Sequence, residues 1–131
     1  MFVPGAAHYG VRFQNMSIIR AEEIELLSFF EVEPKRLDQD VPWPYNDFLY
    51  EVQRGDLSLS FSVAPAYKDV RIILKNGETQ LYELNAVGVE DVRYHNNKGR
   101  EAVEIVINKT DRLWLRVKPE IKLTHEIKEK T

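Results

Sequence analysis

LSLSFSV, at residues 57–63, is the stretch that decides the fold class of this chain, because apolar and hydroxyl side chains alternate at every position. A period of two places successive side chains on opposite faces of a β-strand, so that one face is buried and the other is solvated. The same alternation returns at residues 70–74, 103–107 and 113–117. The sequence therefore predicts a set of half-buried strands.

Turn signals separate these strand-like segments. Asn76-Gly77 is the strongest of them, because a type I′ hairpin turn requires positive φ at both central positions. A second turn is expected at residues 96–99. We expect strands at residues 48–53, 57–63, 67–74, 79–84, 87–94, 101–107, 113–117 and 121–127. Short alternating strands with regular turns predict an antiparallel meander, a β-sandwich or a partly closed barrel.

Residues 21–30 are the one good helix candidate, because Ala, Glu and Leu have high helix propensity. Glu22, Glu23 and Glu25 lie in the first turn, where the helix dipole favours negative charge. Pro34 ends this helix. The fold class is therefore α+β, mainly β, with one N-terminal helix. We expect a single β-rich domain over residues 1–131, with an irregular arm at 1–10, a first strand at 11–18, a proline-containing loop at 34–47 and a frayed tail at 128–131.

Composition narrows the class of function. The net charge of −3 provides no overall basic footprint for nucleic acid. The absence of cysteine excludes disulfides and thiolate metal sites. The apolar stretches are too short to span a membrane, and the N-terminus lacks the features of a signal peptide. We therefore expect a cytoplasmic protein that binds neither nucleic acid nor membrane.

Catalytic and cofactor motifs are missing. His8, His95 and His125 have no metal-site spacing, and we expect them to be surface or half-buried residues. There is no G-x-S-x-G elbow and no glycine-rich phosphate loop. Charged residues around the second hairpin are interpreted as cross-strand pairs on a solvated face: Glu90, Asp91, Arg93, Arg100, Glu101 and Glu104. The sequence thus predicts no enzyme, no cofactor and no metal.

The segment Val-Pro-Trp-Pro-Tyr, residues 41–45, differs from routine structure. Its two prolines favour an extended, polyproline-like form that loses little entropy on binding, and Trp and Tyr are enriched at interface hot spots. Alternatively, Trp43 folds back and covers one end of the sheet core. Trp114 is out of phase with Leu113 and Leu115, so it faces a second packed layer or lies exposed.

Acidic residues concentrate in the helix and in the loop that follows it. An acidic helix beside a rigid aromatic loop would suit a basic protein partner, because complementary fields speed encounter and set register. The alternative is an ordinary solvated helix face. The candidate partner-binding residues are Trp43, Tyr45, Glu22, Glu23, Glu25, Asp38 and Asp40.

In size, acidity and lack of catalytic motifs, the chain is similar in general character to small bacterial immunity proteins of toxin systems. That resemblance implies a non-catalytic domain that binds another protein as an inhibitor. An alternative is a β-sandwich or barrel that binds a small ligand or carbohydrate through aromatics such as Trp43, Tyr50, Tyr67, Tyr82 and Tyr94. A third is an enzyme, which convergence of His95 or His125 with carboxylates in a cleft would support. Exposed edge strands leave a homodimer open.

Overall fold

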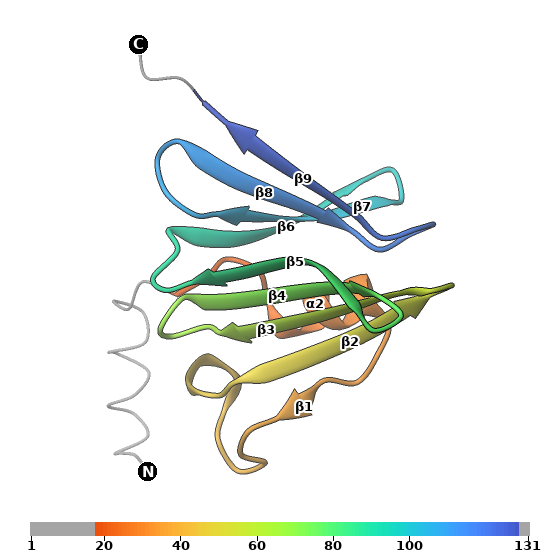
Figure 1. Cartoon of the computed structure of the whole chain (residues 1–131). Helices are drawn as coiled ribbons and strands as arrows, with labels where there is room; N and C mark the ends of the chain where they lie inside the picture. The colour runs from red at the N-terminus through yellow and green to blue at the C-terminus, as the bar shows by residue number, and fades with distance from the viewer. Residues whose placement is uncertain (1–17, 129–131) are drawn as a thin grey trace, which may run out of the picture.

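The described residues, 18–128 of the computed structural model, form two antiparallel sheets, one helix and a short 3-10 turn. Both sheets are meanders, because sequence neighbours pair throughout (Figure 1). The first sheet has the order β1 (Lys35–Arg36), β2 (Phe48–Arg54), β3 (Leu57–Ala64), β4 (Asp69–Asn76) and β5 (Thr79–Ala86). The second has the order β6 (Asp91–Asn97), β7 (Arg100–Val106), β8 (Asp111–Arg116) and β9 (Lys122–Ile127). The predicted α+β, mainly β fold is confirmed.

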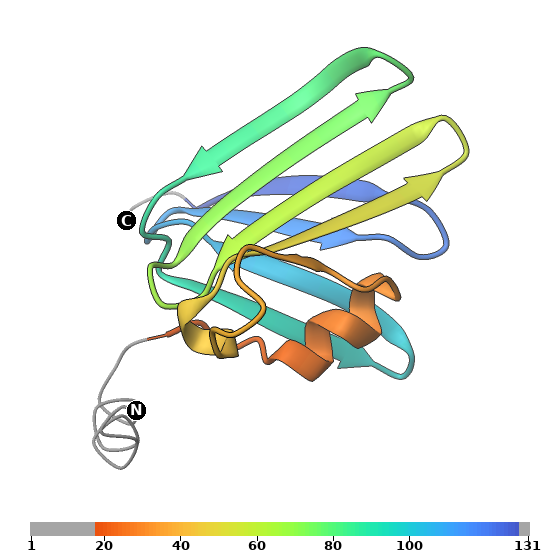
Figure 2. The same cartoon turned by 90° about the horizontal axis from the view of Figure 1, so that it is seen from below.

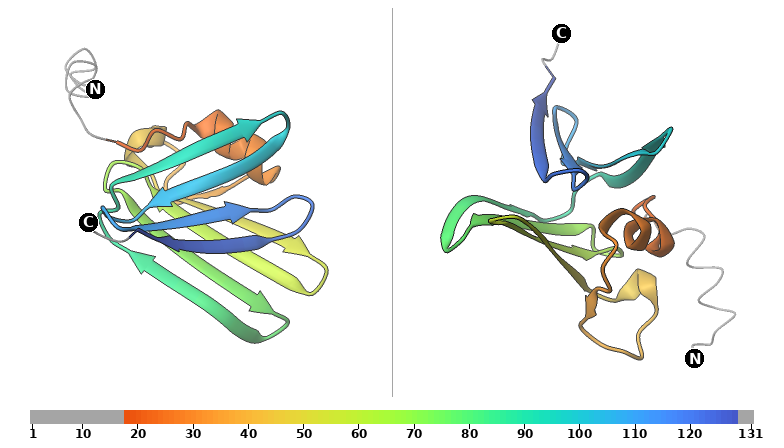
Figure 3. Two further views of the ribbon diagram at one scale, coloured as in Figure 1. Left: turned by 90° about the horizontal axis from the view of Figure 1, so that it is seen from above. Right: turned by 90° about the vertical axis from the view of Figure 1, so that its right-hand side faces the viewer.

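Helix α2 (Glu23–Phe30) lies in the angle between the two sheets (Figure 3). Its two phenylalanines are fully buried and point to different sheets. The Phe30 ring stacks on Tyr50 of β2, with the ring centroids 4.6 Å apart. The Phe29 ring meets Tyr94 of β6 edge-on at 6.5 Å. The helix therefore serves as part of the core for both sheets, and burial of its aromatic side is the main reason for it to dock.

The alternating pattern of β3 behaves as predicted. Leu59 and Phe61 are buried against the core, whereas the intervening serines are half-exposed on the outer face of the first sheet. The same face pattern continues across the sheet, since Phe61 pairs with Tyr50 of β2 and Ile72 of β4. Residues directly opposite in an antiparallel pair share a face, so the register keeps the apolar set together.

The structure corrects the predicted start of one strand and the predicted position of one turn. The strand expected from residue 87 begins only at Asp91, because residues 87–90 cross from the first sheet to the second. The Asn76-Gly77 turn is displaced by one residue: Asn76 pairs with Thr79, so Gly77 and Glu78 are the central pair. Of these two, only Gly77 has a positive φ, of 60°. This is the arrangement of a type II′ turn, which needs glycine at its first central position.

Three further predictions fall wholly or mostly outside the described residues. The arm at 1–10, which contains His8, lies wholly outside them, and of the strand at 11–18 only Ile18 is described, in no strand. Of the predicted tail at 128–131, only Lys128 is described. Within residues 18–128, no helix is both long and apolar enough to cross a membrane.

Candidate protein-binding surface

Asn46 organises the loop that connects β1 to β2, here called the aromatic loop (residues 37–47). Asn46 is only 4% exposed, and its side chain makes four hydrogen bonds to the backbone of the loop. The Nδ2 group donates to the carbonyls of Asp38 and Val41 at 2.6 and 3.0 Å. The Oδ1 atom accepts from the N–H groups of Asp38 and Asp47 at 3.2 and 2.8 Å. One amide therefore replaces the ladder hydrogen bonds that the loop lacks.

The aromatic segment forms the 3-10 turn η1 (Trp43–Tyr45), which corrects the expectation of an extended polyproline-like form. The Tyr45 N–H donates to the Pro42 carbonyl at 3.1 Å, and the Asn46 N–H donates to the Trp43 carbonyl at 3.3 Å. Proline is well placed here, because the first residues of a helical turn need no N–H donor. The prolines thus stiffen a turn and not an extended strand.

Trp43 is half-buried, so the structure falls between the two sequence-based alternatives. Its ring packs on Phe48 at the start of β2, with centroids 4.5 Å apart. Tyr45 is also half-buried. Each aromatic residue of the turn therefore keeps part of its surface available for contact.

An ion pair joins β1, directly before the aromatic loop, to the helix. Arg36 of β1 places Nη2 2.7 Å from Oε2 of Glu23, and its guanidinium lies over the Phe48 ring at 5.3 Å. The Trp43 ring packs on the other neighbour of Arg36 in this chain of contacts, Phe48. Figures 2 and 3 show η1 and α2 side by side on the same side of the first sheet. The sequence missed β1 because it contributes only two residues directly after Pro34.

Two of the remaining candidate acids, Glu25 and Asp38, accept hydrogen bonds from the nearby backbone. Glu25 accepts the backbone N–H of Glu22 at 2.9 Å and so closes the first turn of α2. Asp38 accepts the backbone N–H of Asp40 at 3.0 Å within the aromatic loop. Glu22, Asp38 and Asp40 are exposed. The structure thus connects Trp43 with Glu23 through Arg36 and Phe48, while within residues 18–128 no ion pair or hydrogen bond joins Asp38 or Asp40 to α2.

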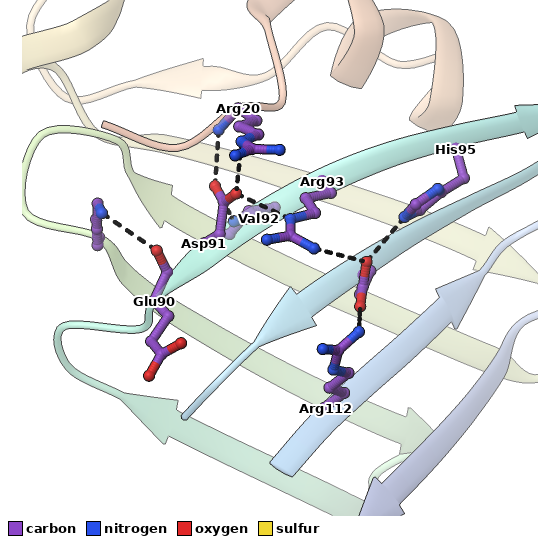
Figure 4. Close-up of polar contacts among 9 residues, drawn as sticks. Arg20, Glu90, Asp91, Val92, Arg93, His95 and Arg112 are labelled. Atoms are coloured by element: carbon purple, nitrogen blue, oxygen red, sulfur yellow. Dashed lines mark hydrogen bonds and ion pairs between the residues drawn. The ribbon is translucent and has the colours of Figure 1, made fainter. Parts of the chain in front are cut away.

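A second polar cluster lies on the outer face of the β6–β9 sheet (Figure 4). Glu104 is only 2% exposed, and its two oxygens are 2.6 Å from Arg112 Nη1 and 2.9 Å from His95 Nε2. Arg93, opposite Glu104 across the β6–β7 pair, is 4.0 Å away and also binds Asp91 at 3.0 Å. Cross-strand charge pairing is thereby confirmed at this position. The burial of Glu104 was not foreseen, because its place in the alternation indicates a solvated side chain.

Each described histidine pairs with a carboxylate, but the two lie on opposite faces of the second sheet. His125 Nε2 is 3.0 Å from Asp111 Oδ1 on the inner face, since the register places His125 opposite Leu113. That hydrogen bond, together with those from Asn108 and Thr110, lowers the pKa of Asp111. No group of three His, Cys, Asp or Glu side chains that could hold a metal occurs among residues 18–128.

Surface hollows lie over the outer faces of both sheets. One of about 510 Å³ covers one end of the first sheet and is lined by apolar side chains that include Leu37, Leu49 and Val87. One of about 610 Å³ covers the ends of β7 to β9 and contains Trp114. The aromatics expected to line a ligand pocket, Trp43, Tyr50, Tyr67, Tyr82 and Tyr94, line neither of them.

Comparison with known proteins gives a structural match. No family model matches the chain, and no curated protein matches it. Among solved structures, the chain is similar to a chain of the contact-dependent growth inhibition toxin–immunity protein complex from Klebsiella pneumoniae 342. The TM-score is 0.70 at 25% sequence identity, and the match covers 85% of this chain and 97% of that chain. The likeness therefore extends over both sheets and not over a local motif.

Proposed function

We propose that this chain is an immunity-type protein of bacterial origin, which binds a protein toxin and blocks its action without catalysing a reaction. The observation that carries the proposal is the structural match to a chain of a toxin–immunity complex, at a TM-score of 0.70 over nearly all of that chain. The match supports protein binding as the activity, because the similar chain was determined in a complex of two proteins.

The negative charge of this chain supports its assignment as the immunity protein, and not the toxin, of such a complex. The chain has a net charge of −3, and exposed acids lie at the N-terminal cap of α2 and on the aromatic loop. We infer that the partner presents a basic surface, since opposite potentials steer encounter and fix the register of a complex. We place the interaction in the cytoplasm. A homodimer through an exposed sheet edge stays a prediction.

We propose that α2 and the aromatic loop form the contact surface, with Trp43 and Tyr45 as its aromatic anchors. The Asn46 hydrogen bonds and the Glu23–Arg36 ion pair support this choice, because a surface held rigid before binding loses little entropy in the complex. The exposed carboxylates of Glu22, Asp38 and Asp40 would face the basic partner. Glu23 and Glu25 would hold the surface in shape while adding negative potential.

A growth-rescue screen tests the function. Each contact-dependent growth inhibition toxin domain encoded in the source genome is induced in bacterial cells with and without this chain. We expect the chain alone to leave growth normal and to restore growth against one toxin. Growth arrest by the chain alone would indicate that the chain is a toxin. Protection against none of the toxins would contradict an immunity role.

A further inference from the structure

We propose a second binding surface, distinct from α2 and the aromatic loop, that takes a carboxylate-rich segment of a protein. It is the hollow of about 610 Å³ over the ends of β7 to β9, here called the basic hollow. The residues that line it are Gly99, Arg100, Glu101, Trp114, Arg116, Lys118, Pro119, Glu120, Lys122 and Thr124. This inference does not rest on the proposed immunity function.

Two like charges face each other in this hollow. Arg116 of β8 and Lys122 of β9 are register partners, so their side chains leave the same face of the sheet directly opposite one another. Directly opposed like charges destabilise an antiparallel pair. Within residues 18–128, neither has a carboxylate within 4.0 Å, and the same holds for Arg100. An external carboxylate would relieve this repulsion, whereas a neutral ligand would not.

Lys118 shows how a lysine of the same hollow is satisfied when the fold provides a partner. Its Nζ lies 2.7 Å from Glu101 and 3.2 Å from Glu31 at the end of α2. Its charge is therefore compensated internally, and the uncompensated charge of the hollow is concentrated at Arg100, Arg116 and Lys122. This contrast favours those three side chains as the carboxylate-binding groups.

Trp114 supplies a fixed aromatic surface beside these cations. Its ring lies 5.2 Å from the ring of His95, and its indole N–H points to Glu126 at 3.4 Å. His95 is held in turn by the buried Glu104. Trp114 is half-buried, and its ring packs on a histidine that an ion pair holds in place. These are the features of a preorganised interface anchor.

Both basic and acidic side chains line the basic hollow, which favours a polypeptide as its ligand. Glu120 also lines the basic hollow, and it would repel the continuous negative charge of a nucleic acid backbone. A peptide offers carboxylates for the three cations together with N–H donors for this acid. The occupant that fits is therefore an acidic protein segment.

Fluorescence of Trp114 tests the proposal. Trp43→Phe leaves Trp114 as the one tryptophan of the chain, so its emission reports on the basic hollow alone. The probe is a hexaglutamate peptide, titrated at low and at about 0.15 M ionic strength, where screening weakens exposed charge contacts. We expect saturable binding that shifts the Trp114 emission and weakens as salt rises.

Charge reversal provides the matched control. We expect Lys122→Glu to weaken peptide binding by about tenfold or more, because one attraction becomes a repulsion. Lys109→Glu makes the same change at an exposed position in the turn between β7 and β8 and should leave binding within about twofold. Circular dichroism of both variants verifies folding. Equal loss in the two variants, no binding of hexaglutamate at millimolar concentration, or tighter binding of single-stranded oligothymidylate would each overturn the proposal.

Discussion

Replacement of Asn46 by alanine should disturb the aromatic loop more than any exposed substitution in it. The variant removes all four side-chain hydrogen bonds that close the loop. The carbonyls of Asp38 and Val41 lose their donor, and the N–H groups of Asp38 and Asp47 lose their acceptor. The backbone hydrogen bonds of the turn and the packing of Trp43 on Phe48 remain in the variant.

The expected size follows from burial. A net contribution of about 0.5–1.5 kcal/mol for each of the four hydrogen bonds gives a sum of about 2–6 kcal/mol. Because the loop backbone lies near the surface, water replaces part of this, and we expect a loss of about 2–3 kcal/mol in the free energy of unfolding. A domain of this size should then melt lower by about 6–15 °C.

Urea denaturation followed by tryptophan fluorescence measures this loss, with Asn108→Ala as the comparison. Asn108 also accepts several hydrogen bonds, from Thr110 and Asp111, but it is exposed. We expect Asn108→Ala to cost less than half as much, since water satisfies the groups it leaves behind. A loss below about 0.5 kcal/mol for Asn46→Ala, or equal losses in the two variants, would refute the argument from burial.

The other predictions concern groups elsewhere in the fold. Tyr50→Phe should raise the free energy of unfolding by about 1 kcal/mol in urea denaturation, because the Tyr50 hydroxyl is buried with no hydrogen-bond partner among the described residues. A decrease of that size in the free energy of unfolding would contradict this prediction. Glu104→Gln should lower stability by about 1–3 kcal/mol, since Arg112 and His95 lose a nearly buried carboxylate, while Glu126→Gln at an exposed site should change little. The lowered pKa of Asp111 means that its hydrogen bonds contribute stability above its unfolded pKa of about 3.9, and that this contribution disappears as pH falls through the folded pKa. His125→Ala should therefore move the Asp111 pKa upward in an NMR titration, and an unchanged value would contradict the assignment of His125 as the main cause.

Periodicity was enough to predict most of the sheet structure. Strand β3 and the second hairpin follow from alternation and turn residues, which act locally. Strand β1 was missed because two residues after a proline carry no periodic signal, and they pair only because Phe48 and Leu49 lie opposite them. The start of β6 was placed too early because the crossing between sheets depends on tertiary packing.

The candidate surface was predictable in composition but not in geometry. Trp43 and the acidic helix stand out in the sequence, but the contact between them runs through Arg36 and Phe48, which a pattern of residue types cannot reveal. Asn46 gave only the signal of a turn residue. Its role depends on four backbone groups that converge on it after folding.

Titration calorimetry of this chain with the toxin identified by the growth-rescue screen tests the central claim most directly. Asp40→Lys and Glu78→Lys make the same charge reversal at two exposed sites, one in the aromatic loop and one in the β4–β5 turn. We predict one-to-one binding of the unmodified chain, about tenfold weaker binding of Asp40→Lys, and unchanged binding of Glu78→Lys. Absence of binding would contradict the immunity-type function, and equal affinity of the two variants would contradict the proposed surface.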